Sequence, residues 1–301
     1  MITQPNVKIN LGLNVLRKRP DGYHDLETLF VPCFDLHDTL EIIHGDDWSR
    51  TSAALQNSSA KTGDFVPELA NKANSSAKKA VFAPELVQGI TEDGKVMITI
   101  ARKEGVDWDP LQDLTVKAYQ LLAADHKLPP VKIYLQKGAP VGAGLGGGSA
   151  DAAFALRMIA EIAELGLTDE QLAAYAARLG SDCAFFVYNR PMFGSGRGEV
   201  LEEFPLDLSG FRFDIFIPQG IAVSTATAYR GIVPHIPEKP LRDILLQDPA
   251  TWKEELKNDF EQTVFAAYPS LAGIKERLYA DGALYAAMSG SGSAFFSVFR
   301  K

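Results

Sequence analysis

Cysteine is scarce in this sequence, with only Cys33 and Cys183 among 301 residues. The two lie far apart and in no spacing typical of zinc or redox sites, so no disulfide framework is implied and a reducing compartment is expected. Long apolar runs are missing too. No stretch is long enough to span a bilayer, and no basic region followed by an apolar run opens the chain. We therefore expect a cytoplasmic protein that does not contact a membrane.

An excess of positive charge is also absent. The formal net charge is −8 and the isoelectric point is about 5.2, which argues against a general nucleic-acid binder. A phosphate ligand would then have to be held by local donors and a metal ion. The chain length and an apolar fraction of 46% suit one large or two medium domains with a substantial core.

Glycine, in contrast, is concentrated in one loop. The run comprises Pro140, Val141, Gly142, Ala143, Gly144, Leu145, Gly146, Gly147, Gly148, Ser149, Ala150 and Asp151. Packing does not explain so many glycines, but close approach of backbone N–H groups to a ligand does. The apolar segment 150–165 predicts a buried helix with Ser149 as its N-cap. A loop that ends on a helix N-terminus predicts a phosphate or anion site.

Four interpretations of this loop compete. In a P-loop, Gly148 would occupy the position of the phosphate-binding lysine. A dinucleotide-binding glycine fingerprint fits Gly142 to Gly147, but the next helix leads to a capping box at Thr168 and not to a second strand with a ribose-binding acid. A flexible linker would not continue directly into a buried helix. The fourth interpretation, a loop that wraps triphosphate with backbone N–H groups alone, fits Pro140, Gly144-Leu145-Gly146 and Ser149-Ala150.

Other segments give a coarse secondary structure. Strands are expected at 7–15, 26–40, 95–101, 131–135, 181–187 and 211–218, and helices at 114–124, 169–179 with Gly180 as a C′ residue, and 252–266. Residues 45–94 show no sustained periodicity and are expected to form an insertion or long connection without a role in the chemistry. A second domain is expected to start near Gly194, which divides the chain into 1–193 and 194–301.

Polar residues mark three further places. The first strand carries Lys8 and Asn10 on one face, and a Pro-Asp-Gly turn that follows it ends in Tyr23 and His24. Asp182 precedes an apolar segment, as either a cap or a functional carboxylate; the glycine loop upstream favours function. Small residues at 288–294 are expected to bring a second backbone segment close to the glycine loop or its ligand.

Together these segments resemble the GHMP kinase family, named after galactokinase, homoserine kinase, mevalonate kinase and phosphomevalonate kinase. The resemblance covers most of the chain and rests on the blocks at 8–13, 19–24, 144–153 and 179–182. It implies an α+β fold of two domains, a ribosomal S5 domain 2-like N-terminal domain and a ferredoxin-like C-terminal domain, with the active site in the cleft. The first block and the triple glycine together are typical of the member whose alcohol substrate carries cytidine diphosphate.

The resemblance also implies residue roles. Lys8 and Asp182 would be catalytic, and the loop from Pro140 to Ala150 would bind ATP, with Mg²⁺ at or near Ser149. The cytidine diphosphate substrate would contact Asn10, Tyr23, His24 and Tyr229, with tyrosine rings stacking on the base and His24 reading its edge. The expected partners are small molecules, without nucleic acid or membrane, for a monomer or weak homodimer.

The sequence departs from the family at two points. The connection 45–94 is longer than usual, and Asp113 stands where the family has Asn before the helix that precedes the loop. Two alternatives stay open: a kinase for mevalonate or another small alcohol, and a nucleotide-binding regulatory protein without turnover.

Overall fold

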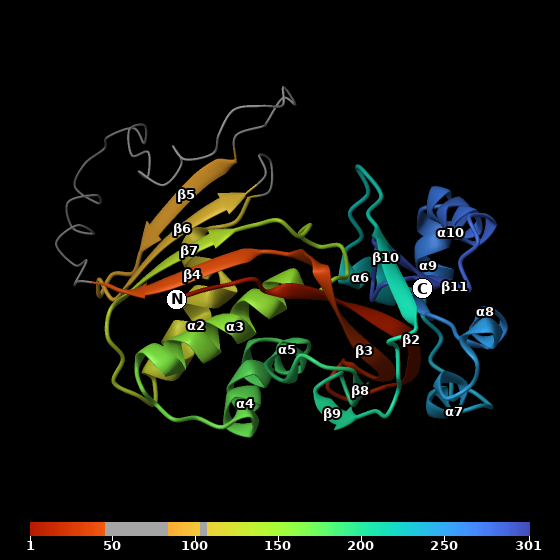
Figure 1. Cartoon of the computed structure of the whole chain (residues 1–301), viewed down its shortest axis with the longest axis horizontal. Coiled ribbons are helices and arrows are strands. Elements are labelled where there is room, and N and C mark those ends of the chain that lie inside the picture. Colours follow the sequence, from red (N-terminus) through yellow and green to blue (C-terminus); the bar gives the residue numbers. More distant parts are fainter. Residues whose placement is uncertain (46–83, 103–106) are drawn as a thin grey trace.

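The computed structural model describes residues 1–45, 84–102 and 107–301. Three sheets and the helices that cover them form two halves (Figure 1). Mixed helices and sheets confirm the predicted α+β class. The predicted division between residues 193 and 194 falls inside a short strand, β8 (Met192–Ser195), and remains a prediction.

Within the described residues, a five-stranded sheet and four helices form the first half (Figure 1). The strand order is β1 (Ile2–Thr3), β4 (Thr39–His44), β7 (Val131–Gln136), β6 (Val96–Arg102) and β5 (Glu85–Ile90), in which only the β6–β7 pair is parallel. The helices are α2 (Leu114–Ala123), α3 (Gly147–Ile162), α4 (Asp169–Leu179) and α5 (Cys183–Tyr188). Apolar side chains of β4, β6 and β7 pack against these helices in one core, because each element buries its apolar face.

A second, antiparallel sheet joins the two halves. Its order is β2 (Asn6–Lys18), β3 (His24–His37), β8 and β9 (Val200–Glu203). The pairing of β2 with β3 shifts register between Leu11 and Leu13, where Gly12 has a φ of 73° that only glycine adopts readily. Side chains from β2 and β3 pack against the third sheet in a further core. The predicted strand at 7–15 is therefore confirmed.

The C-terminal half contains the third sheet, in the order β10 (Phe211–Phe216), β12 (Phe295–Arg300) and β11 (Tyr285–Met288). Its helices are α6 (Thr225–Tyr229), α7 (Leu241–Leu245), α8 (Trp252–Glu255), α9 (Phe260–Ala267) and α10 (Ser270–Ala280). Two short 3₁₀ helices, η2 (Pro110–Gln112) and η3 (Pro249–Thr251), complete the described elements. A third core contains apolar residues of α6, α9, α10, β11 and β12. Leu13 and Val15 of β2 pack into the same core.

Several sequence expectations were wrong in detail. Ser149 is not an N-cap, because α3 begins at Gly147 with Gly146 as its N-cap. Residues 183–188 form helix α5 and not a strand; a short apolar run does not distinguish the two by periodicity. The helix expected at 252–266 is interrupted between α8 and α9. Gly180 caps α4 with an extended φ of 178°.

The predicted connection 45–94 contains a regular strand near its C-terminal end. Residues 46–83 lie outside the described part of the chain, and residues 85–90 form the edge strand β5, so this end of the connection is regular. The helices at 114–123 and 169–179 and the capping box of Thr168 and Gln171 are confirmed.

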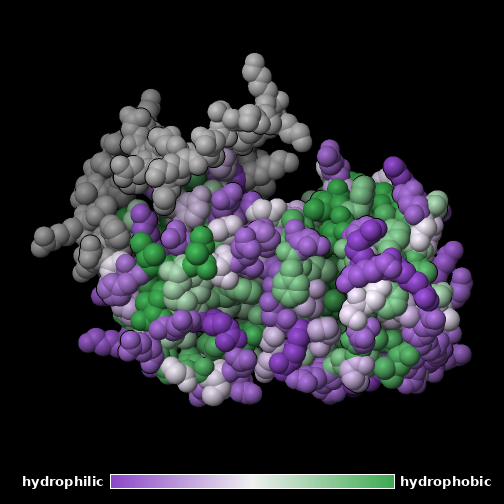
Figure 2. Space-filling view, viewed as in Figure 1, coloured by the Kyte–Doolittle hydropathy of each residue, from purple (hydrophilic) through white to green (hydrophobic). Residues whose placement is uncertain are grey.

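Hydrophilic side chains are spread over both halves of the face shown in Figure 2, with apolar ones between them. In the described part of the chain, no helix has both the length and the apolar character that a membrane crossing requires.

Candidate active site

The glycine loop separates two hollows in the surface. The first cavity, of about 470 Å³, is lined by residues of both halves, among them Lys8, Asn10, Thr28, Asp182, Arg197, Tyr229 and Ser291. The second, of about 440 Å³, is lined on one side by Trp108, Gln112, Asp113 and Leu114, and on the other by much of the loop. Gly142, Gly144, Gly146 and Ser149 line both. Ligands in the two cavities would therefore meet at this loop.

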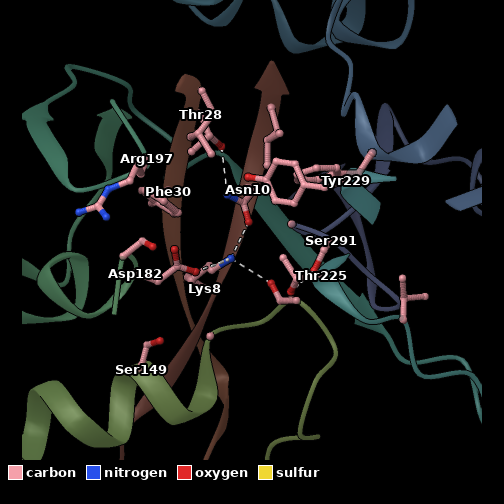
Figure 3. Close-up of a pocket in the computed structure, with 18 of the residues that line it drawn as sticks. Lys8, Asn10, Thr28, Phe30, Ser149, Asp182, Arg197, Thr225, Tyr229 and Ser291 are labelled. Atoms are coloured by element: carbon pink, nitrogen blue, oxygen red, sulfur yellow. Dashed lines mark hydrogen bonds and ion pairs between the residues drawn. The ribbon is translucent and has the colours of Figure 1, made fainter. Parts of the chain in front are cut away.

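Lys8 lies at the centre of the first cavity (Figure 3). Its side chain is buried, and its Nζ donates to Asn10 Oδ1 at 2.6 Å and to the Gly144 carbonyl at 2.9 Å. The Lys8 backbone N–H donates to Leu145 O at 2.9 Å. Strand β2 is thus joined to the loop through both main chain and side chain, and a buried ammonium obtains the partners it requires.

Asp182 faces Lys8 from the start of α5. Its Oδ2 lies 3.3 Å from Lys8 Nζ, and 33% of its side chain is exposed against 3% for Lys8. Asp182 is the N-cap residue of α5, but its side chain makes no capping hydrogen bond. The cap interpretation left open by the sequence is therefore not supported. A carboxylate beside a lysine at a cavity wall is an arrangement that can take a proton from a hydroxyl group.

A chain of hydrogen bonds fixes Asn10. Its Nδ2 donates to Thr28 Oγ1 at 3.1 Å, and Thr28 donates in turn to the Gly12 carbonyl at 2.5 Å. Since Lys8 uses Asn10 Oδ1, the amide orientation is set from both ends. Asn10 holds the lysine as well as lining the cavity. Thr28 was not singled out in the sequence, where it is one of many threonines.

The small-residue segment of the C-terminal half closes the other side. Ser289 Oγ donates to the Gly144 carbonyl at 3.0 Å, and the Ala294 N–H donates to Ala143 O at 3.1 Å. A Cβ on Gly144 would lie 2.1 Å from Ser289 O, so only glycine permits this approach. Asn258 donates to the carbonyls of Met288 and Gly290 at 2.7 and 2.9 Å. The expected approach of two backbone segments is confirmed.

The second cavity contains most of the predicted phosphate-binding residues. Pro140, Val141, Gly142, Ala143, Gly144, Gly146, Gly147, Gly148 and Ser149 line it. Leu145 and Ala150 are buried in the cores instead, so their contribution to a ligand would come from the main chain. Gly142, Gly144 and Gly146 have φ values of 73–76°, a conformation that turns successive N–H groups toward one side of a loop.

A buried charge cluster lies beneath the loop and was missed in the sequence. Lys137 Nζ donates to Asp38 and, at 2.6 Å, to Asp151 Oδ2. Asp38 Oδ1 accepts from the N–H groups of Gly138 and Ala139 at 2.7 and 2.8 Å. The residues just before the loop are thereby tied to α3 just after it. No local signal identifies the cluster, because Asp38 is a hundred residues away from its partners.

The cluster contains two carboxylates and one ammonium. Burial raises the pKa of Asp151 well above its ordinary value; Lys137 opposes this effect and Asp38 adds to it. Burial by itself lowers the pKa of Lys137, but Asp151 and Asp38 outweigh it and raise the pKa. Asp151 Oδ1 is buried without a hydrogen-bond partner among the described residues. Since Asp151 and Lys137 also line the second cavity, this oxygen can serve a bound ligand.

Asp113, the departure from the family pattern, has a structural role. Its Oδ1 accepts from the Thr115 N–H at 2.9 Å and from Thr115 Oγ1 at 2.7 Å, which caps α2. Its Oδ2 accepts from Trp108 Nε1 at 3.1 Å. Trp108 thereby acquires a fixed position in the second cavity, where an indole ring is suited to stack on a flat base.

Of the three predicted aromatic residues, Tyr229 reaches the first cavity. Tyr229 lines it, and its ring stacks on His24 at 4.8 Å and meets Phe260 edge-on at 4.8 Å. Tyr23 and His24 are not lining residues; Tyr23 is 57% exposed and lies under the Arg197 guanidinium. Burial raises the pKa of Tyr229, and the charge of Asp182 adds to this. The Tyr229 ring is stacked on His24 and the Tyr23 ring lies under Arg197, so stacking of a base between the two tyrosines stays a prediction.

No group of three or more His, Cys, Asp or Glu side chains suited to a metal ion occurs in the described ranges. The assignment of Mg²⁺ near Ser149 therefore stays a prediction.

Comparison with known proteins gives two family matches. Residues 113–190 match the GHMP kinases N terminal domain, and residues 241–301 match the GHMP kinases C terminal domain. Named relatives align over nearly the full chain. A 4-diphosphocytidyl-2-C-methyl-D-erythritol kinase of Bacteroides fragilis is 42% identical over 99% of this chain and 92% of its own. The kinase of the same name from Azobacteroides pseudotrichonymphae is 40% identical over 100% of this chain and 94% of its own.

Solved structures agree in fold. A crystal structure of 4-(cytidine 5'-diphospho)-2C-methyl-D-erythritol kinase matches with a TM-score of 0.69 and 29% identity over 99% of this chain and 89% of the other. The crystal structure of homoserine kinase from Cytophaga hutchinsonii matches with a TM-score of 0.58 and 14% identity. The match covers 98% of this chain and 85% of the other. The second likeness concerns the fold alone.

Proposed function

The chain belongs to the 4-diphosphocytidyl-2-C-methyl-D-erythritol kinase family of the GHMP kinases, and we propose that it phosphorylates that cytidyl alcohol with ATP. The 2-hydroxyl oxygen attacks the γ-phosphorus, the bond to the bridging β–γ oxygen breaks, and the products are ADP, the 2-phosphate and a proton. This reaction belongs to the non-mevalonate, methylerythritol phosphate route to isoprenoid precursors.

One observation carries this proposal: two cavities share the glycine loop as a wall, and the Lys8–Asp182 pair lies in the first of them. Phosphoryl transfer requires an in-line approach of two substrates and neutralisation of charge, with little covalent work by the protein. ATP in the second cavity would direct its terminal phosphate toward the loop. The alcohol in the first cavity would then present its hydroxyl beside Asp182.

Each residue of the pair has a role in this reaction. Asp182 accepts the hydroxyl proton as the new P–O bond forms. Lys8, held by Asn10 and the Gly144 carbonyl, keeps a positive charge beside Asp182 and beside the oxygens of the transferred group. Because Lys8 is already positioned before substrate binds, little reorganisation is required when charge develops.

The ATP phosphates are assigned to the backbone N–H groups of the glycine loop and the N-terminus of α3. Mg²⁺ fits the same place: Ser149 faces both cavities, and Asp151 offers a buried oxygen without a partner in the described chain. Hydroxyl and carboxylate oxygens are the ligands this ion prefers. When bound, the ion neutralises part of the phosphate charge.

The cytidine end of the substrate is assigned to Tyr229, His24 and Tyr23. Tyr229 offers a half-buried ring at the cavity wall, and a flat base can stack there. The His24 imidazole and nearby backbone groups would distinguish cytosine from uracil by their hydrogen bonds. We place the enzyme in the cytoplasm as a monomer or weak homodimer that acts on small molecules, in keeping with its acidic charge and two unpaired cysteines.

Incubation of the purified protein with ATP, Mg²⁺ and each of three alcohols tests the proposal: the cytidyl alcohol, mevalonate and homoserine. Mass spectrometry of the products should show one added phosphate on the cytidyl alcohol alone. Phosphorylation of mevalonate in its place would favour the other small-alcohol kinase. Binding of ATP with no product from any alcohol would favour a regulatory role.

A further inference from the structure

Arg197 is a cation at the first cavity that the chemistry above does not use. It lies in the four-residue loop between β8 and β9, whose strands pair Ser195 with Val200, and it lines the first cavity but not the second. Figure 3 shows it on the same side of the cavity as Asp182, on a separate segment of chain. Its side chain is 38% exposed, so it is accessible to a ligand.

The loop holds Arg197 in a defined position. Glycines on both sides have positive φ values, 69° at Gly196 and 107° at Gly198, and Gly196 O accepts from the Leu26 N–H of β3 at 2.7 Å. Glu199 accepts from the Arg197 backbone N–H at 2.5 Å and from its Nε at 3.2 Å. These contacts anchor the loop to the sheet and fix the base of the side chain.

The outer part of the guanidinium is available. Its centre lies 5.0 Å from the ring centroid of Tyr23, which orients the plane. Glu199 takes the Nε proton, and no hydrogen bond from Nη1 or Nη2 to another described residue is present. Burial alone raises the pKa of Glu199, but backbone hydrogen bonds and Arg197 outweigh it and lower the pKa. Glu199 therefore stays ionised and leaves two terminal nitrogens of Arg197 to a ligand.

The charges around the cavity indicate which ligand this is. Of the described lining residues, Lys8, Asp182 and Arg197 carry charge. Lys8 is paired with Asp182 inside the cavity. Arg197 is paired through Nε with Glu199, which does not line the cavity, so the terminal nitrogens of Arg197 are the cationic donors left for a ligand. The planar fork of an arginine matches phosphate oxygens, with which it forms two parallel hydrogen bonds. A bare polyol offers no such group, whereas a diphosphate offers several anionic oxygens.

We propose that Arg197 binds the diphosphate of the cytidyl substrate and so selects a nucleotide-linked alcohol over a bare one. This inference rests on the proposed function. The reacting hydroxyl is assigned to Asp182 and the base to Tyr229 and the adjoining His24, and the diphosphate joins these two ends of the substrate. Arg197 lies over the ring of Tyr23, the residue before His24. In Figure 3 its guanidinium points outward from Lys8, so the diphosphate would meet it at the rim of the cavity.

Two substitutions test this role. Arg197→Met keeps an unbranched apolar stem and removes the donors, and Arg197→Lys keeps the charge without the fork. KM for the cytidyl alcohol should rise about tenfold in Arg197→Met, a factor equivalent to about 1.4 kcal/mol, with kcat and KM for ATP close to the parent values. Arg197→Lys should lie between the parent and the methionine variant.

The chain offers a matched control in Arg212. It forms the same kind of pair with an acid two residues later, Asp214, at 2.8 Å, and its guanidinium lies 4.9 Å from the Phe299 ring centroid. It lies on β10 and lines neither cavity. Arg212→Met should leave every kinetic constant as in the parent, while any change in folding stability should resemble that of Arg197→Met.

Direct binding separates the diphosphate from the base. With the ATP site saturated by a non-hydrolysable ATP analogue, calorimetry would compare CDP and cytidine. The parent should bind CDP more tightly than cytidine, and Arg197→Met should lose that preference while it binds cytidine equally well. Loss of both affinities to the same extent would overturn the proposal and assign Arg197 to the base site through Tyr23.

The kinetic outcomes are equally distinct. An unchanged KM for the cytidyl alcohol, or a fall in kcat with KM unchanged, would overturn the role, since the second result assigns Arg197 to the transferred phosphoryl group. Failure of the proposed function has a different signature: the parent protein itself would yield no phosphorylated cytidyl alcohol, whatever the CDP affinity of the variant.

Discussion

At the scale of single residues, the central feature is the pairing of Lys8 with Asp182. The lysine is almost completely buried and the aspartate is partly exposed, so the cation is fixed and the carboxylate faces the cavity. This asymmetry suits a proton acceptor that must reach a substrate and a cation that must not move.

Asp182→Asn tests this assignment. The amide is nearly isosteric but cannot accept the hydroxyl proton, so kcat should fall by about 10² to 10⁴. The Kd for ATP should stay within about twofold, because Asp182 lines only the first cavity. Steady-state kinetics and calorimetry measure the two quantities.

Glu255→Gln provides the control, since it breaks the half-exposed pair with Lys239 outside both cavities and should leave kcat as in the parent. Near-parental turnover in Asp182→Asn would remove the aspartate from the chemistry.

At the scale of elements, the glycine loop is held at three places. The cluster of Asp38, Lys137 and Asp151 joins its two ends, the Lys8 main chain binds its middle, and the Ser289 hydroxyl reaches it from the C-terminal half. Glycine entropy opposes such a fixed conformation. These contacts offset that cost and hold the N–H groups in place before the nucleotide arrives.

Gly146→Ala should weaken ATP binding by about tenfold or more and raise KM for ATP. The residue has a φ of 75°, and a Cβ would lie 3.1 Å from the Phe186 ring and 3.2 Å from Lys8 Cε. The added methyl group is strained by about 1–2 kcal/mol from φ alone and also pushes on Lys8. Calorimetry with ATP and thermal unfolding measure the two effects.

Gly166→Ala is the matched control: its φ is 61° and a Cβ there has open space. It should share the loss of stability and keep the parental ATP affinity. Equal ATP affinity in both variants would count against a phosphate-binding role for the loop.

At the scale of the whole molecule, both halves build the first cavity. Asp182, at the start of α5, comes from the N-terminal half. Lys8 and Thr28 come from β2 and β3, and Tyr229, Phe260 and Ser291 come from the C-terminal half. The sheet containing β2 and β3 runs between them (Figure 1). A ligand in this cavity therefore contacts both halves and should stabilise them together.

The melting temperature should rise when CDP or ADP is added, and more when both are present. At 100 times its Kd, each ligand contributes about 2.7 kcal/mol to the free energy of unfolding. Differential scanning calorimetry should show a single transition that shifts upward with CDP. Two transitions, of which CDP moves only one, would mean that the cavity does not couple the halves.

The sequence by itself determined the features that depend on local chemistry. The strand carrying Lys8 and Asn10, the glycine loop and the capping box at Thr168 each follow from residue types at fixed short spacings. The α+β class and the kinase family were also readable, because the motif blocks are specific. The approach of residues 288–294 to the loop was predictable, since so many small residues serve no packing purpose.

Only the tertiary structure decided the rest. The apolar run 183–188 became a helix where a strand was expected, because periodicity in so short a run is ambiguous and packing chooses. Contacts with residues far away in the sequence position four further side chains of the site: Arg197, Thr28, Lys137 and Asp38. Lys8 and Asp182 are 174 positions apart in the sequence, yet Lys8 Nζ lies 3.3 Å from Asp182 Oδ2. Such a contact depends on how strands pair and helices pack, and no local sequence pattern encodes it.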